Sequence, residues 1–436
     1  MKLSEIGEAQ RADGVDFIQN EIKRVITDFG DRDPGSEGER KALSYMSDTL
    51  TQLGADVKTE SFKVAPHAFF GWTYFVSIFM TLAVPIYFLA PVMSIVCAII
   101  AVVPLILQFV FYLPALDWMF YKGESGNVLG AYKPEGEVKR RVVINGHSDA
   151  VYEWHWHYVG GYAMFLGSII VVIVGLLYIL ATAVSAIVLC GPIGMPSDGL
   201  IWAGVAACAF IPFFIAFWFF ADTRKVVPGA NDNLTACYMA IAAIKTMRDN
   251  DIKLQNTEVV ALITGSEEAG LRGAKAFVKN NPDYAREQDV ETVFLTYETL
   301  RELEYLGIYN RDLNGTVRND AQACALYKRV ALKHGMDLPY GSVYAGATDA
   351  AAFSKGGYKA VSVAAMNPSV QKYYHTRLDN YDNLSPECLA KVFDITMDFI
   401  DTFDKHGFDI PESEAVQAQA AAADADVSDD TPAVEE

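Results

Sequence analysis

Two long blocks without a charged side chain constrain the fold of this 436-residue chain more than any other feature. The first block covers 69–116 and is divided by Pro91, and the second covers 158–197 and resumes at 199–221 after a polar break. A helix needs about 20 apolar residues to cross about 30 Å of hydrocarbon. Each block therefore predicts a pair of membrane-spanning helices, which gives four spans in two hairpins. Buried core helices are the alternative, but they rarely contain so long an uncharged run.

The flanks of the two blocks predict an orientation in the membrane. Each hairpin returns the chain to the side on which it began, so all polar segments lie on one side. Lys63, Lys122, Arg224 and Lys225 lie close to the spans on that side, whereas the hairpin tips contain no Lys or Arg. Because Lys and Arg are enriched in cytoplasmic loops, we expect a multi-pass integral membrane protein whose polar domain is cytoplasmic. The lipid bilayer is then one of its partners.

The charge distribution excludes some kinds of partner. The net charge is −19, and residues 411–436 contain eight acidic side chains and no Lys or Arg. This tail has no apolar periodicity, so we expect it to be disordered. An acidic chain without a basic run is a poor nucleic-acid binder, and we expect no nucleic-acid partner. The six cysteines show no CxxC spacing, which favours reduced thiols over a metal site.

The polar segments 1–68, 122–157 and 222–410 together are long enough for one α/β domain, with the hairpins 69–121 and 158–221 inserted into it. Apolar patterns predict strands at 55–64, 127–132, 141–145, 257–264, 292–297 and 359–364. Amphipathic patterns predict helices at 16–29, 37–53, 234–248, 270–279, 321–334 and 386–403. Short apolar strands that alternate with helices are typical of an α/β fold with a mixed, mostly parallel sheet flanked by helices.

Acidic and imidazole side chains follow the predicted strands or precede a predicted helix. In sheets of this kind the functional groups gather at the carboxyl ends of the strands, so we expect these side chains to meet. A mixed set of imidazole and carboxylate ligands suits zinc or another divalent first-row ion. The candidate residues are His147, Asp149, Asp232, Glu267, Glu268, Glu298 and His375.

Each of these residues also has a structural interpretation. The His147-Ser148-Asp149 stretch alone is typical of a surface turn, and Glu267-Glu268 of a solvated helix start. The loop 228–233 could be a turn that caps a helix, and His375 could be an ordinary hydrogen-bonding residue. The joint placement of all these residues at strand ends favours the metal site.

Five motifs in this order resemble peptidase family M28, the zinc aminopeptidases. They are PGSEG at 34–38, GHSDA at 146–150, PGANDN at 228–233, GSEEAGLRGAKAF at 265–277 and YHTRLDN at 374–380. Each motif alone is weak evidence, whereas all five in order are specific. The resemblance extends from about residue 32 to residue 400, apart from the hairpins, and implies the zinc-peptidase fold for the polar domain.

The resemblance implies two zinc ions per chain, although other divalent ions are possible. Asp232 corresponds to the carboxylate that bridges both ions, and the peptide bond after it is often cis in the family. His147 and Glu298 correspond to ligands of the first zinc, and Glu268 and His375 to ligands of the second. The family usually has Asp where this chain has Glu298, and the longer side chain changes the reach of that ligand.

Two further residues have roles that the resemblance implies. Asp149 corresponds to the carboxylate that orients the imidazole of His147, and Glu267 corresponds to the general base. The implied function is a membrane-anchored aminopeptidase that removes amino-terminal residues of peptides through a hydroxide held by both zinc ions. The segment 347–353 lacks a histidine that the family has, so we expect only a structural role for Asp349.

Two other functions are compatible with the same residues. One is a glutaminyl-cyclase-like acyltransferase that uses a single zinc, and the other is a catalytically inactive receptor or scaffold of the same fold. The second is disfavoured because every ligand position and the base are occupied by competent residues. The segment 153–157, EWHWH, could supply an extra metal site or contacts for substrate entry, but its aromatic residues favour anchoring at the membrane interface. We expect the hairpins to tether the enzyme at the inner membrane face, which would limit it to membrane-proximal peptides.

Overall fold

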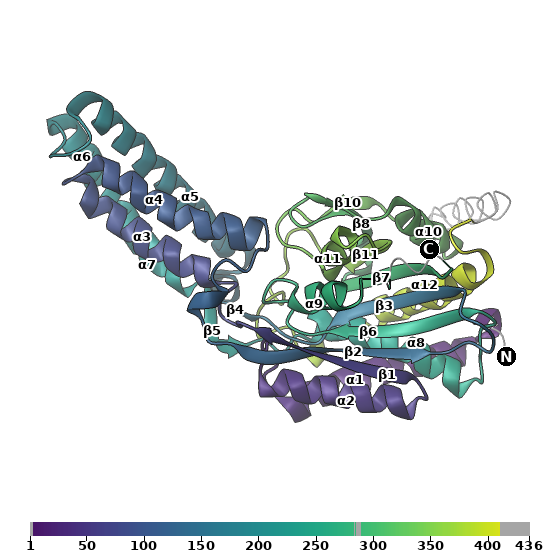
Figure 1. Cartoon of the computed structure of the whole chain (residues 1–436). Helices are drawn as coiled ribbons and strands as arrows, with labels where there is room; N and C mark the ends of the chain where they lie inside the picture. The colour runs from purple at the N-terminus through teal and green to yellow at the C-terminus, as the bar shows by residue number, and fades with distance from the viewer. Residues whose placement is uncertain (1–2, 283, 285–288, 410–436) are drawn as a thin grey trace, which may run out of the picture.

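The computed structural model describes residues 3–282, 284 and 289–409 and has two parts (Figure 1). A bundle of apolar helices projects from one end of a larger domain that is built around a β-sheet. The acidic tail at 411–436 lies outside the described residues.

The larger domain contains a nine-stranded sheet with the order β1-β2-β6-β3-β7-β11-β8-β10, and β9 pairs with β8. The neighbours β6, β3, β7 and β11 are parallel, whereas β1 and β2 form an antiparallel edge. This confirms the predicted α/β fold with a mixed, mostly parallel sheet. The strands are β1 (Asp56–Val64), β2 (Gly123–Tyr132), β3 (Arg140–His147), β6 (Thr257–Thr264), β7 (Glu291–Leu300), β8 (Leu306–Asp312), β9 (Val317–Arg318), β10 (Tyr340–Ser342) and β11 (Ala360–Ala365).

Helices cover both faces of this sheet because its central strands are apolar on both sides. In β6, Val259, Ala261 and Ile263 point into one core, whereas Val260 and Leu262 point into the other. Such strands appear in sequence as a continuous apolar run. The first core is shared with α1 (Glu8–Phe29), α2 (Glu37–Gln52), α8 (Thr235–Asp249), α10 (Ala321–Lys333) and α12 (Pro386–His406). The second is shared with α9 (Arg272–Asn280) and α11 (Asp349–Lys355).

The bundle consists of α3 (Gly71–Tyr87), α4 (Pro91–Leu105), α5 (His155–Cys190), α6 (Asp198–Ala207) and α7 (Ile211–Ala216). Three stretches are long and apolar enough to cross a membrane, namely Pro91–Val110, His155–Cys190 and Asp198–Phe219. The segment predicted as a span before Pro91 forms a shorter apolar helix than expected, α3, which has 17 residues. The apolar residues before it, Phe69 and Phe70, are buried against the sheet domain and belong to the protein core.

The outer surface of the bundle is apolar. Val188, Leu189 and Trp202 are each more than 70% exposed, and exposed apolar patches of this kind mark contact with a membrane or a partner. At its base the bundle continues into the second core, where Trp72 packs against Phe217 and Phe220.

Each hairpin leaves and rejoins the sheet domain at paired residues. Val64 at the end of β1 pairs with Gly123 at the start of β2, on either side of the first hairpin. The second hairpin is closed by a separate antiparallel ribbon of β4 (Tyr152–Trp154) and β5 (Ala221–Val226). Each hairpin is therefore a long insertion between two residues or strands that lie next to each other in space.

Candidate metal centre

The fold brings the five predicted ligands and the predicted base to the carboxyl end of the parallel strands. His147 is the last residue of β3, and Glu267 and Glu268 follow the end of β6. Asp232 lies in the irregular turn Ala230–Leu234 before α8, and its peptide bond to Asn233 is cis, as the family resemblance implied.

Glu298 differs from the prediction because it lies inside β7 and not after it. Ala364 of β11 pairs with Glu298, whereas Ala365 pairs with Leu300, so Thr299 is an extra residue in β7. Thr299 has a φ of 44°, in the left-handed region. A bulge of this kind changes the direction of the neighbouring side chain. Here the neighbouring residue is Glu298, whose side chain reaches the metal centre.

The two carboxylate oxygens of Asp232 lie near different histidines. Oδ1 lies 3.2 Å from Nε2 of His147, and Oδ2 lies 2.9 Å from Nε2 of His375. Each imidazole has a second acidic neighbour, because His147 Nε2 is 3.6 Å from Glu298 Oε1 and His375 Nε2 is 3.4 Å from Glu268 Oε1. The residues thus form two sets, each with one histidine and one glutamate, and the sets share Asp232.

The donor atoms of this centre fit a metal ion. His147, Asp232 and Glu268 offer ligand atoms that all lie within 4.8 Å of one another. Asp232 Oδ1 and His375 Nδ1 are buried, and neither atom has a hydrogen-bond partner among the described residues. Glu267 approaches the same group, with its Oε2 3.9 Å from His147 Nε2.

The electrostatics of the centre favour a bound cation. Burial, together with the neighbouring carboxylates, raises the pKa of Glu267 and Glu268 well above the usual carboxyl value and that of Glu298 to about 8. Burial opposes ionisation of Asp232 as well, but the neighbouring imidazoles of His147 and His375 hold its pKa well below the usual range. Since so many buried carboxylates cannot all be charged alone, a divalent cation would stabilise their ionised forms.

Asp149 lies behind the centre and links two of its loops. Its Oδ1 accepts a hydrogen bond from the backbone N–H of Glu267 and its Oδ2 from that of Glu268, each at 2.9 Å. Its contact with His147 is longer, 3.4 Å from Nδ1 to Oδ1. The carboxylate predicted to orient His147 therefore also fixes the backbone of the general-base candidate.

The sequence interpretation missed two buried acids that hold the loops of the centre. Asp379 accepts hydrogen bonds from the backbone N–H groups of Asn231 and Asp232 at 3.0 and 3.1 Å. Glu39 accepts from the N–H and hydroxyl of Ser266 at 2.6 and 3.0 Å. Asp379 lies within the motif YHTRLDN and Glu39 directly follows PGSEG, so these motifs were the available signal.

Asp349 matches its expected structural role. It is buried, and its carboxylate accepts a hydrogen bond from the hydroxyl of Thr264, the last residue of β6. Burial raises the pKa of Asp349 to about 6. It therefore supports the strand that leads into Ser266 and Glu267.

The segment 153–157 lies against the metal centre, and membrane anchoring does not describe it fully. The ring centroids of Trp154 and His375 are 4.3 Å apart in an edge-to-face arrangement, and the backbone N–H of Trp154 donates to the backbone carbonyl of His375 at 2.8 Å. His157 is buried, and its Nε2 lies 3.1 Å from the carbonyl oxygen of Gln371. On its other side His375 stacks on Tyr374, with centroids 3.9 Å apart. Trp154 and His157 thus hold the loop of a predicted ligand.

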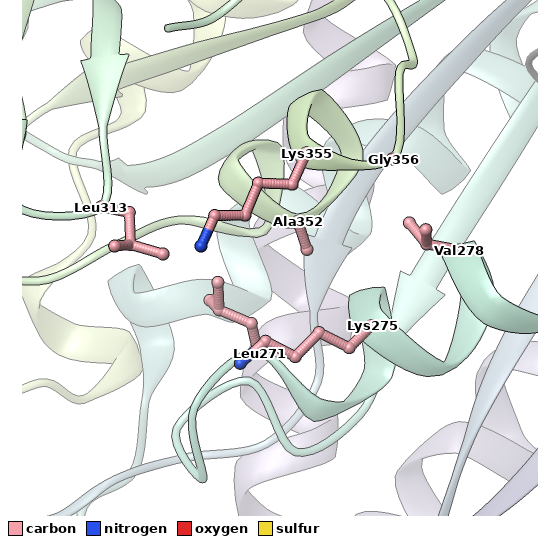
Figure 2. A pocket seen from close by; sticks show the side chains of 7 residues that line it. All are labelled: Leu271, Lys275, Val278, Leu313, Ala352, Lys355 and Gly356. Atoms are coloured by element: carbon pink, nitrogen blue, oxygen red, sulfur yellow. The ribbon is translucent and has the colours of Figure 1, made fainter. Parts of the chain in front are cut away.

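A separate pocket of about 190 Å³ lies between α9 and α11. Figure 2 shows Lys275 and Lys355 extending along it, with Leu271 and Leu313 at one end. The residues of the metal centre do not line this pocket. The candidate site for chemistry is therefore the centre itself.

The raised pKa values predict how the metal-free protein responds to pH. Unfolded Glu298 releases its proton near pH 4.5, whereas the folded protein holds it up to about pH 8. Between these values the folded state binds more protons than the unfolded state, so the free energy of unfolding falls as pH rises. We expect the melting temperature in chelator to fall from pH 5 to pH 8.5, and the fall to be smaller in Glu298→Gln. A melting temperature that rises over this range would contradict the assignment.

Comparison with known proteins agrees with this geometry. Residues 220–400 match the model of peptidase family M28. The fold is similar to that of an aminopeptidase from Aneurinibacillus sp. strain AM-1, with a TM-score of 0.53 and 14% identity over 90% of this chain and 95% of the other. A zinc aminopeptidase from Bacillus subtilis gives a TM-score of 0.52 and 13% identity over 88% and 94% of the two chains.

A glutaminyl cyclase from Porphyromonas gingivalis has a similar fold too, with a TM-score of 0.50 and 11% identity over 89% of this chain and 97% of the other. A comparison with curated protein sequences found no match. The motifs and the sheet agree with this match of residues 220–400 to the model of peptidase family M28.

Proposed function

We propose that this protein is a membrane-anchored, zinc-dependent aminopeptidase with two metal ions per chain. The observation that carries the proposal is the shared position of Asp232 between His147 and His375, with Glu267 beside it. The family match and the similarity to zinc aminopeptidases support the choice of zinc and of peptide substrates.

Five side chains would hold the metal in this proposal. His147 and Glu298 would hold one ion, His375 and Glu268 would hold the other, and Asp232 would serve both. Bound zinc supplies a Lewis acid that polarises the scissile carbonyl and lowers the pKa of water. A carboxylate shared by both ions also reduces their mutual repulsion.

Glu267 is the proposed general base. It is buried, it is not needed as a ligand, and burial raises its pKa well above the usual carboxyl value, toward the range that suits a proton shuttle near neutral pH. It takes a proton from the attacking water and delivers it to the leaving amine. Asp149 positions it by binding its backbone N–H. The reaction is amide hydrolysis that releases the amino-terminal residue.

The direct test is amino-acid release from a panel of peptides by detergent-purified full-length protein. We expect release of single amino-terminal residues, loss of that release in chelator, and recovery when zinc is restored. Activity that survives complete removal of the metal would overturn the proposal.

Glutaminyl-cyclase-like chemistry is the second candidate, because glutaminyl cyclases share the fold. Metal stoichiometry separates the two functions. Two ions per chain, together with hydrolysis of peptides that do not begin with Gln, support the peptidase. One ion per chain, with cyclisation of amino-terminal Gln and no hydrolysis, would support the cyclase.

The apolar bundle supports the membrane part of the proposal. It would hold the metal centre near the cytoplasmic face and favour membrane-proximal peptides. With this orientation, alkaline phosphatase fused after Gly194 at the tip of the second hairpin should be exported and active, whereas a fusion after Gly407 should be inactive. The opposite pattern would show that the sheet domain lies on the other side of the membrane. Two active fusions would contradict the prediction that the second block is a hairpin.

A further inference from the structure

The first hairpin ends in a segment that is fastened to the sheet domain next to the loop of Glu267. Asn314, which follows β8, donates hydrogen bonds from Nδ2 to the carbonyl oxygens of Phe109 and Val110 at 2.9 and 3.2 Å. On the opposite side Lys275 Nζ donates to the carbonyl oxygens of Tyr112 and Gly270 at 2.6 and 2.8 Å. The end of the hairpin is thus held by side chains from the loop after β8 and from α9.

Tyr112 occupies the central position in this segment. Its φ is 54°, in the left-handed region that non-glycine residues rarely adopt. Its ring is 7% exposed and packs 5.0 Å from the ring of Phe69. An uncommon backbone conformation at a well-packed residue indicates that the surrounding structure determines its direction.

The ring of Tyr112 lies over the loop that carries the general-base candidate. A Cβ placed on Gly270 would lie 3.7 Å from Cδ1 of Tyr112, and the N–H of Gly270 donates to the carbonyl oxygen of Glu267 at 2.7 Å. A Cβ placed on Gly346 would lie 3.9 Å from the Tyr112 hydroxyl. The phenol therefore reaches between the Glu267 loop and the loop at Gly346.

The hydroxyl of Tyr112 keeps its proton, because it is buried and the charges of the metal centre act on it. Burial raises the pKa of Tyr112 well above its usual value, and the charges of Glu267 and Glu268 raise it further. Within the described part of the chain the hydroxyl has no hydrogen-bond partner, so its proton remains available for a ligand.

We propose that the Tyr112 hydroxyl is a specificity-determining donor, which binds the peptide carbonyl oxygen of the residue that follows the scissile bond. The assignment to this side of the substrate follows from Glu267, which lies nearest to the leaving amine in the proposed reaction. Hairpin 1, defined as residues 69–121, would then supply one wall of the substrate site. The inference rests on the proposed function for the identity of the substrate.

The test uses two ligands that differ only on the leaving side. Leucyl-glycinamide has a peptide carbonyl after the scissile bond, whereas leucine p-nitroanilide has none. In active zinc-loaded protein, we expect Tyr112→Phe to lower kcat/KM for leucyl-glycinamide by about tenfold, since one hydrogen bond of ordinary strength is lost. Hydrolysis of leucine p-nitroanilide should change less than twofold. Tyr121→Phe is the matched control, because Tyr121 is 82% exposed.

Calorimetry separates this inference from the proposed function. Both ligands are titrated into zinc-loaded protein in a Glu267→Gln background, which removes turnover, with and without Tyr112→Phe. A weaker Kd for leucyl-glycinamide alone supports the inference even if the wild type hydrolyses no peptide. An equal loss for both ligands, or no loss for either, would overturn it. If neither ligand binds the Glu267→Gln parent, both proposals fail.

Discussion

Replacement of Glu267 by Gln should lower kcat by about a thousandfold while the protein keeps its fold and its metal. Glutamine has nearly the same shape but cannot accept and return a proton, and general acid–base catalysis contributes 10²–10⁴-fold in typical enzymes. The backbone N–H of residue 267 still donates to Asp149, so the loop should stay in place. Initial rates, zinc content and the melting temperature would be measured on the same preparation.

Glu304→Gln is the matched control for this variant, because Glu304 is exposed and far in sequence from the motifs. It should have wild-type activity. A Glu267→Gln protein that retains more than a tenth of the activity with full metal content would exclude Glu267 as the general base.

Replacement of Asp232 by Ala should have a comparable effect on activity by a different route. Among the described residues, Asp232 alone has its two oxygens near both histidines, so its loss removes a ligand from each proposed ion. We expect zinc content to fall from two ions per chain to one or none, and kcat to fall at least a thousandfold because the attacking water is then no longer activated.

Asp48→Ala, which removes an exposed carboxylate from α2, is the control for the loss of one negative charge. Metal content would be measured by mass spectrometry after gel filtration in metal-free buffer. Retention of two ions by Asp232→Ala would show that this residue does not bridge them.

The elements that could be predicted from the sequence are those whose apolar pattern is long or complete. The strand at 257–264 has the predicted bounds, because its eight buried residues end at a clear turn. The strands β4, β5, β8 and β10 were missed, since each pairs with a strand far along the chain, and β9 was missed because it has only two residues. The length of the first span was overestimated, because an apolar run has the same sequence pattern whether it contacts lipid or, as Phe69 does, a protein core.

In the candidate site, too, features set by the local sequence could be predicted, whereas features set by distant partners could not. All five predicted ligands and the predicted base converge, because each is placed by the end of a strand or by the loop after it. The bulge at Thr299 could not be foreseen, since it depends on the register with β11. Tyr112 could not be found either, because it lies at the end of an uncharged block where the membrane pattern conceals any other signal.

The pairing of Val64 with Gly123 makes the first hairpin separable from the architecture of the sheet. A tight turn that joins these two residues would preserve the register of β1 and β2 and release that edge of the protein from the bilayer. The same deletion would remove Tyr112 from the substrate site. The proposed membrane attachment and the proposed contact of Tyr112 with the substrate would therefore be lost together, while the sheet keeps its pairing.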